Sequence, residues 1–198
     1  MSKLYGDAHR ALQRAFDTER LADRIEERLC RARITDEDRA FIESRELFFL
    51  ATADAAGRPS CSYKGGDPGF VRVLDERHIA FPSYDGNGMY LSAGNLTENP
   101  NVGLLFIDLA SPKRLRLNGR AHIAAPDAVA PAFAGAQFVI VVEVRELFPN
   151  CPRYIHKYQL VERSAFVPRA GVPTPVPAWK KMDWARDVLP KGDPAAGE

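Results

Sequence analysis

Between residues 46 and 149 the chain is a succession of short strand-like runs, and this rhythm constrains the fold more than any other feature. Residues 47–54 and 60–64 flank the turn sequence AAGRP, which predicts a β-hairpin. Further strands are expected over residues 70–75, 77–84, 101–110, 114–125 and 136–148. Because the alternation of strands with crossover helices that marks a doubly wound sheet is missing, the sequence predicts a largely antiparallel barrel or sandwich of six or seven strands.

Helices are expected on the N-terminal side of these strands. Apolar residues recur at helical spacing through residues 8–34 amid alternating charges, at Leu12, Phe16, Leu21, Ile25 and Leu29. The interleaved acids and bases favour a solvated face over a basic binding helix. A second helix is expected from Thr35, a good N-cap, with Asp38 three residues later as an approximate capping-box partner.

The segments outside the strands suggest three parts. Residues 85–100, rich in Gly, Ser and Asn, are expected to hold a short helix that begins near Asn87. Four prolines between positions 168 and 177 predict an extended arm, and residues 191–198 read as a frayed tail. We therefore expect an N-terminal helical extension over residues 1–34, a barrel domain over 35–158, and a C-terminal arm and tail over 159–198.

Charge and cysteine content exclude several functional classes. The formal net charge is +1, which gives no general attraction to nucleic acid or to a membrane surface. The three cysteines, Cys30, Cys61 and Cys151, lack the spacing of a disulfide framework or a metal site. Since the start has no apolar leader segment and no run approaches transmembrane length, a soluble cytoplasmic protein is expected.

Three segments carry the groups that a phosphate needs, namely cations, hydroxyls, amides and bare backbone N–H groups. They are Lys64 with its glycines, residues 83–95, and residues 113–116. Each has an ordinary explanation: Lys64 as a surface lysine, the polar residues of 83–95 as helix caps, and the arginines of 113–116 as the wet face of a strand. Their order along one sheet favours a shared anion site.

Acid–base and nucleophilic catalysis find no support in the sequence. The four histidines have no carboxylate at a diagnostic spacing, and the GxSxG, GxGxxG and Walker patterns are missing. No catalytic residue can therefore be named. If the protein performs chemistry, a bound cofactor is the expected source.

Four spaced motifs in order carry a family resemblance. They are GGDPGF at residues 65–70, GNGMYLSAGNLTENPNVGLLFID at 86–108, RLRLNGRA at 114–121 and NCPRYI at 150–155. Across roughly residues 40–158 the chain resembles the pyridoxamine 5'-phosphate oxidase-like, FMN-binding split barrels, and within them the predicted flavin-nucleotide-binding branch. The resemblance implies a mainly β fold with flanking helices, a six-stranded antiparallel Greek-key split barrel, and a homodimer with FMN at the subunit interface.

The resemblance also implies a set of cofactor-binding residues. Lys64 matches the basic residue of a strand that approaches the flavin and phosphate, and Leu91-Ser92 stands where the oxidase has an Arg-Lys phosphate clamp. The residues of 113–116 would be presented to the partner's FMN. The expected cofactor-binding set is Lys64, Gly65, Gly66, Ser83, Asn87, Ser92, Asn95, Arg114 and Arg116.

The implied function is that of an FMN-dependent oxidoreductase acting on an unidentified small substrate. Because the oxidase's C-terminal Arg-x-His substrate motif is missing, oxidation of pyridoxamine phosphate itself is not expected. The alternative is a non-catalytic module that holds flavin, haem or another cofactor on the same barrel. The arm, with Trp179 and Trp184, could cap the partner's flavin with an aromatic ring, although a tryptophan that anchors packing is the favoured interpretation.

Overall fold

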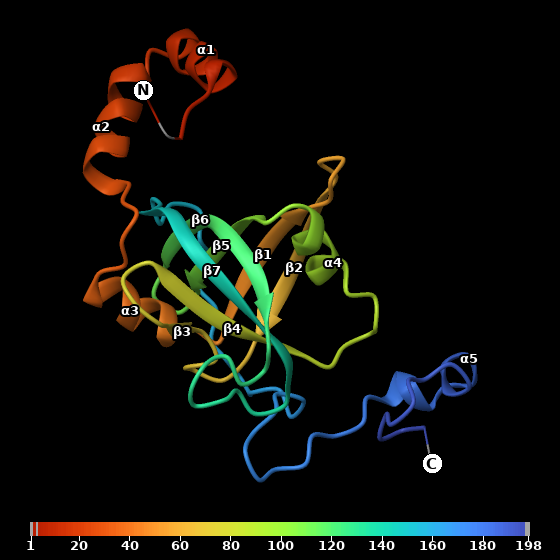
Figure 1. The fold of residues 1–198 in the computed structure, drawn as a ribbon. Helices are drawn as coiled ribbons and strands as arrows, with labels where there is room; N and C mark the ends of the chain where they lie inside the picture. Colours follow the sequence, from red (N-terminus) through yellow and green to blue (C-terminus); the bar gives the residue numbers. More distant parts are fainter. Residues whose placement is uncertain (1, 3, 197–198) are drawn as a thin grey trace.

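The structure, a computed structural model, describes residue 2 and residues 4–196 and is built on one curled antiparallel sheet (Figure 1). Its strand order is β2-β1-β5-β6-β7-β4-β3. This confirms the expected antiparallel split barrel with flanking helices. The described strands number seven, within the six or seven that the strand pattern predicts and one more than the resemblance implies. The strands are β1 Leu47–Ala53, β2 Pro59–Gly65, β3 Arg72–Val73, β4 His78–Tyr84, β5 Asn101–Asp108, β6 Lys113–Ala124 and β7 Ala136–Pro149.

The additional strand is β3, which pairs with β4 over only two residues. Side chains of helix α3 (Asp36–Glu43) form hydrogen bonds with the outer edge of β3. The Val73 N–H donates to the Glu43 carboxylate at 2.9 Å, and the Arg39 guanidinium donates to the Val73 carbonyl at 2.6 Å. The expected strand over 70–75 is shortened by turns at both ends, since the Phe70 N–H bonds back to the Asp67 carbonyl and the Leu74 and Asp75 N–H groups bond to the His78 carbonyl.

The barrel interior is filled by aromatic and branched side chains from the inward faces of the strands. Phe48 on β1 is fully buried, and its ring lies 4.9 Å from that of Phe81 on β4 and 5.2 Å from that of Phe106 on β5. Buried aromatic side chains remove a large apolar area from water and therefore contribute strongly to the stability of the core. Buried and less buried positions alternate along β1 and β5, as expected for strands that turn one face to the core.

The pairing of β6 with β7 contains a bulge at Gly119. A Cβ at this position would overlap the Glu143 carbonyl and come within 2.9 Å of Val142. Only a glycine lets the two backbones approach this closely. The bulge bends the two longest strands, which the sheet needs in order to curl.

Helix α3 begins as the sequence predicted. Thr35 Oγ1 accepts the Asp38 N–H at 3.2 Å, and the Asp38 carboxylate accepts the Thr35 N–H at 2.9 Å, which completes a capping box. Asp38 is buried and also pairs with the Arg31 guanidinium. Burial raises the pKa of Asp38, but the hydrogen bonds from Arg31 and Thr35 outweigh it, so that the pKa falls below 3.8.

The single helix expected over residues 8–34 is wrong, because the structure has two helices there, α1 (Asp7–Ala15) and α2 (Glu19–Leu29). Asp17 breaks them apart with φ of 52°, a left-handed conformation that aspartate tolerates better than most residues. Arg10 of α1 pairs with Asp23 of α2 at 2.7 Å across the turn. The apolar stripe stays exposed, with Phe16 at 75% exposure, and the pair extends away from the barrel (Figure 1).

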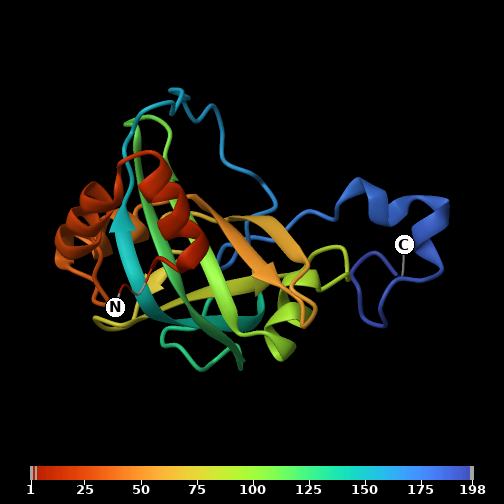
Figure 2. The same cartoon turned by 90° about the horizontal axis from the view of Figure 1, so that it is seen from above.

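The chain beyond Pro149 runs as an extended arm, and between residues 150 and 177 it forms no helix. Arg169 fastens this arm to the GGDPGF loop, where its guanidinium donates to both Asp67 oxygens at 2.6 and 2.9 Å. The arm leads to a compact unit, the 3-10 helix η1 (Ala178–Lys181) and α5 (Asp183–Arg186), which lies beside the barrel (Figure 2).

The frayed tail predicted for residues 191–198 is wrong as far as residue 196, and residues 197–198 lie outside the described residues. Asp193 forms an ion pair with the buried Lys180, and Ala195 is buried. The sequence did not predict the Lys180–Asp193 ion pair, because both residues lie in a segment that is polar and rich in proline. Of the helices in the described parts of the chain, none is long and apolar enough to cross a membrane.

Candidate functional site

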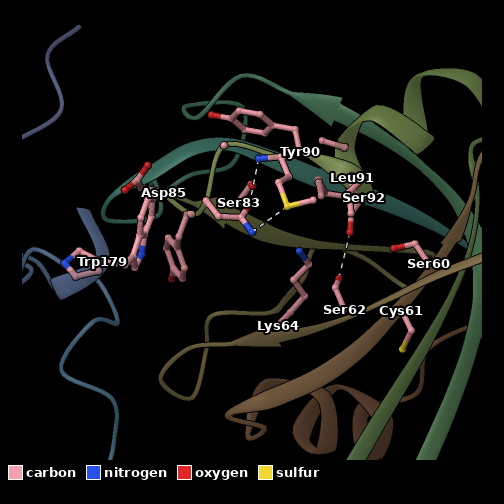
Figure 3. A pocket seen from close by; sticks show the side chains of 18 residues that line it. Ser60, Cys61, Ser62, Lys64, Ser83, Asp85, Tyr90, Leu91, Ser92 and Trp179 are labelled. Carbon is pink, nitrogen blue, oxygen red and sulfur yellow. Dashed lines mark hydrogen bonds between the residues drawn. The ribbon is translucent and has the colours of Figure 1, made fainter. Parts of the chain in front are cut away.

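A cleft of about 470 Å³ opens between β2, the loop before α4 (Leu91–Glu98) and the C-terminal arm (Figure 3). Four elements supply its walls. They are residues 60–62 and 64 of β2, residues 83–93 with the start of α4, Ile140 of β7, and Pro177 and Trp179 of the arm. The cleft therefore combines the end of a barrel strand, a helix N-terminus and a segment distant in sequence.

Lys64 is the cation of this cleft. Its side chain is half-buried and points into the cleft toward the strand that carries Ser83 (Figure 3). Burial lowers the pKa of its ammonium below the ordinary 10.5. Within the described residues the ammonium has no salt bridge and no hydrogen bond. A desolvated cation without a partner is costly for the fold alone, and an anionic ligand would remove that cost.

Serine hydroxyls surround the same space. Ser62 Oγ and Ser92 Oγ lie 3.1 Å apart and share a hydrogen bond that joins β2 to α4. Ser60 lines the cleft from the same strand face, as Figure 3 shows. The alternation of β2 places residues 60, 62 and 64 on one face of the strand. This face therefore presents two hydroxyls and one ammonium to a ligand.

The N-terminus of α4 opens into the cleft without a side-chain cap. Tyr90 precedes the helix in a left-handed conformation, with φ of 48°, and no side chain caps the helix there. The first-turn residues 91–93 line the cleft and carry backbone N–H groups that have no partner within the helix. Since no acidic residue occupies this turn, the positive end of the helix dipole faces the cleft.

The start of α4 corrects the expectation that the helix begins near Asn87. The Asn87 side chain accepts the Met89 N–H at 3.1 Å, and Gly88 has φ of 74°. This turn occupies the chain up to residue 90, because Asn hydrogen-bonds its own backbone two residues on in preference to starting a helix. Asn87 consequently lines the cleft from a loop.

The structure brings four of the nine expected cofactor-binding residues to the cleft and leaves five outside it. Those in the cleft wall are Lys64, Ser83, Asn87 and Ser92. Asn95 instead donates to Thr52 Oγ1 at 2.9 Å and fastens α4 to the buried end of β1. Its place on the helix is therefore explained by packing.

The two expected glycines face their own neighbours. A Cβ on Gly65 would meet the Tyr63 ring at 2.7 Å, and one on Gly66 would overlap the Phe70 ring. The Gly66 N–H donates to the Glu46 carbonyl at 2.9 Å. These glycines admit local side chains, and the cleft wall ends at Lys64.

The two expected arginines lie on β6, away from the cleft of their own chain. Arg116 is exposed and its guanidinium lies 5.5 Å from the centre of the Phe148 ring. The buried Nε of Arg114 has no hydrogen-bond partner. A single chain does not combine either arginine with Lys64.

Sequence reasoning missed several cleft residues. Asp85 is one, and its partner Lys180 is another group that the sequence did not single out. The Lys180 ammonium donates to Asp85 at 2.6 Å, although 95 positions separate them. Cys61 belongs to the cleft wall, but its exposed side chain points to the opposite face of β2 from Ser60 and Ser62 (Figure 3). The sequence analysis interpreted residues 60–64 only as a strand. Because side chains on one strand face recur every two residues, the prediction for Lys64 could have been extended to Ser62 and Ser60.

We compared the chain with known protein families and with curated protein sequences. The family described as pyridoxamine 5'-phosphate oxidase matches residues 34–162. A search of curated protein sequences gives no match.

Solved structures resemble part of the chain. HupZ of Group A Streptococcus is 20% identical, covers 59% of this chain and 93% of its own, and gives a TM-score of 0.48. HutZ, a heme storage protein from Vibrio cholerae, is 20% identical over 59% of this chain and 94% of its own, with a TM-score of 0.41. An FMN-binding protein from Syntrophomonas wolfei is 11% identical over 70% of this chain and 96% of its own, with a TM-score of 0.39.

Proposed function

The chain belongs to the pyridoxamine 5'-phosphate oxidase family, and from that premise we propose that it binds flavin mononucleotide and acts as an oxidoreductase on a small substrate. The observation that carries the proposal is the half-buried ammonium of Lys64, which points into the cleft and has no partner among the described residues. The phosphate makes FMN anionic, and reduction adds a negative charge on the ring. A fixed positive charge therefore favours binding of both oxidised and reduced FMN.

The chemistry of the cleft wall fits a phosphate at one end. Ser62, Ser92 and the free N–H groups at the start of α4 would hold the phosphate oxygens. Lys64 would offset the negative charge from β2. Hydroxyls, backbone N–H groups and a cation on two facing elements make up the phosphate-binding set that a single chain supplies.

The rest of the cleft fits a planar ring. Its volume of about 470 Å³ lies within the range of roughly 300–1,000 Å³ usual for small-ligand sites. Leu91, Met89, Tyr84 and Ile140 supply apolar surface beside the polar end. The bound flavin would supply the transfer of electrons, while this chain binds the cofactor, orients it and supplies a positive charge.

A homodimer is part of the proposal. Arg114 and Arg116 stand outside the cleft of their own chain, and we propose that each chain presents them to the cofactor of its partner. The unpartnered Nε of Arg114 and the exposed Arg116 support this arrangement. Mixing Lys64→Met chains with Arg116→Ala chains tests it, because a mixed dimer would regain one complete cleft. Mixtures that bind FMN no better than either parent would count against shared clefts.

The spectrum of the purified protein tests the cofactor. We expect flavin absorbance in the isolated protein, or uptake of added FMN retained through gel filtration. A Lys64→Met variant should lose most of it, whereas Lys157→Met, a change at an exposed lysine outside the cleft, should retain it. Colourless protein that takes up no FMN would refute the proposal, and a Soret band would indicate haem in its place.

Turnover distinguishes an enzyme from a binding module. Bleaching of the bound flavin by NAD(P)H or another small reductant, followed by recovery in air, would support the oxidoreductase. Bound FMN that no reductant bleaches would identify a non-catalytic flavin-binding module, which is the alternative that the same cleft supports.

A further inference from the structure

The C-terminal unit, residues 177–196, forms one side of the cleft. Pro177 and Trp179 line the cleft. In Figure 3 Trp179 lies on the opposite side from Ser60 and Cys61, with Lys64 between them. The end of the chain therefore faces the polar wall of β2 across the ligand space.

Lys180 holds this unit against the rim of the cleft. Its side chain is 5% exposed, and its ammonium donates to Asp85 in the cleft loop and to Asp193 in the tail, each at 2.6 Å. A buried ammonium is stable in a protein only when it is paired. One lysine thus ties three segments together at the position next to Trp179.

Trp179 is braced from within the same unit. Its ring stacks on that of Trp184 with centroids 5.9 Å apart and an angle of 16° between the planes. Trp184 is itself 68% exposed, and neither tryptophan belongs to the buried core clusters of the barrel. The pair therefore does not serve as a core anchor, and the partly buried Trp179 contributes surface to the cleft.

We propose that Trp179 is a ligand-binding wall that contacts the planar ring of the bound cofactor, and that Lys180 is a positioning residue that holds it there through Asp85. The inference rests on the proposed function, because the ring is that of the flavin. An indole offers a large flat π-face to another aromatic system at little conformational cost. The serines and Lys64 lie across the cleft from it, which assigns the phosphate to one wall and the ring to the other.

Paired titrations with FMN and riboflavin test the wall, because the two ligands share the ring and differ in the phosphate. Trp179→Ala should raise both dissociation constants by the same factor, about tenfold, as expected for the loss of an aromatic stacking partner. Trp179→Phe should retain most of the affinity. Lys64→Met should weaken FMN far more than riboflavin. Unchanged affinities in Trp179→Ala, or a loss confined to FMN, would overturn the inference.

Asp85 gives a test of positioning whose sign is informative. If Asp85 acted only as a negative charge in the cleft wall, Asp85→Asn would tighten binding of an anionic ligand. If it acts through Lys180, the same change loosens the unit and weakens both FMN and riboflavin, while Asp85→Glu restores binding. Asp85 is 59% exposed at its side chain, so that these changes leave the barrel core intact. Tighter binding by Asp85→Asn would overturn the role of Lys180.

Hydrogen exchange on the ligand-free protein provides a readout that does not depend on the cofactor. Asp85→Asn and Lys180→Met should speed exchange over residues 178–186, and Lys191→Met, at an exposed lysine of the same unit, should not. Unchanged exchange would overturn the anchoring role. Wild-type protein that binds neither flavin would overturn the proposed function and the wall together, whereas wild-type binding that Trp179→Ala leaves intact overturns the wall alone.

Discussion

Replacing Lys64 by methionine should weaken ligand binding without weakening the fold. Methionine keeps an unbranched side chain of similar length and removes only the charge. In the folded protein this charge is half-buried and unpaired among the described residues. A residue retained for stability would cost stability when removed, and a residue retained for a ligand would not.

The size of the affinity loss follows from the surroundings of the ammonium. Fully exposed ion pairs contribute only about 0.2–1 kcal/mol. Two unit charges 4 Å apart near a protein surface interact by about 4 kcal/mol. Lys64 lies between these cases, so the loss should be about 1.5–3 kcal/mol, the value of a hydrogen bond to a charged group. The dissociation constant for FMN should therefore rise roughly 10- to 150-fold.

The pH dependence of stability gives an independent check with a defined sign. Burial lowers the pKa of Lys64 in the folded chain below the 10.5 of the unfolded chain. Between these two values the unfolded chain binds more protons, so the Lys64 contribution raises the free energy of unfolding as pH rises. Lys64→Met should lack this rise and should equal or exceed the wild type in stability at pH 7.

Two assays together decide the matter. Fluorescence titration gives the dissociation constants of FMN and riboflavin, and urea unfolding at pH 7 and near pH 10 gives the stability. A Lys64→Met variant that binds FMN as tightly as the wild type would refute the reasoning. So would a variant that is markedly less stable at pH 7, because the ammonium would then have a structural partner.

Three substitutions test the fold, and one labelling experiment tests the accessible thiols. Gly119→Ala should destabilise the protein by about 1–3 kcal/mol, because the added Cβ has no room at the bulge. Gly94→Ala changes a helical position with open space around it and should stabilise the protein by roughly 0.5–1 kcal/mol. Urea unfolding measures both effects. Asp38→Asn should cost about 2 kcal/mol at pH 7, since it breaks the capping box and the ion pair with Arg31. Because the pKa of Asp38 is lowered in the fold, this difference should shrink as pH falls through that pKa, below 3.8. Hydrogen bonds from the backbone and side chain of Arg153 lower the pKa of Cys151. Iodoacetamide followed by peptide mass spectrometry should therefore find Cys151 alkylated faster than Cys61.

The fold was predictable where the signal is local. The hairpin of β1 and β2 follows from two alternating runs around a short turn, and the start of α3 follows from Thr35 and Asp38. The break at Asp17 was not predictable, because the apolar spacing continues through it and a single left-handed residue leaves no periodic trace. The short β3 was not predictable, because turns at Phe70 and at Leu74 cut a continuous apolar run to two residues.

The candidate site was only partly predictable because polar residue types do not reveal their partners. Asn95 has the chemistry to hold a phosphate, yet its amide donates to Thr52, which lies 43 positions earlier. Lys180 reads as one charge of a polar tail and is in fact the buried link between the tail and the cleft. Which polar groups are left over for a ligand depends on long-range pairing, which only the structure supplies.

The unpaired positive charge in the cleft is the physical basis of the proposed site. The acidic side chains near the cleft are already engaged, since Asp67 pairs with Arg169 and Asp85 pairs with Lys180. Their pairing leaves the positive charge of Lys64 uncompensated beside an open helix N-terminus. Because the whole chain carries a formal net charge of only +1, attraction of an anion must come from this local imbalance, not from the field of the molecule. FMN affinity should therefore fall with salt in the wild type and fall less steeply in Lys64→Met, because that variant keeps only the arginines proposed to come from the partner.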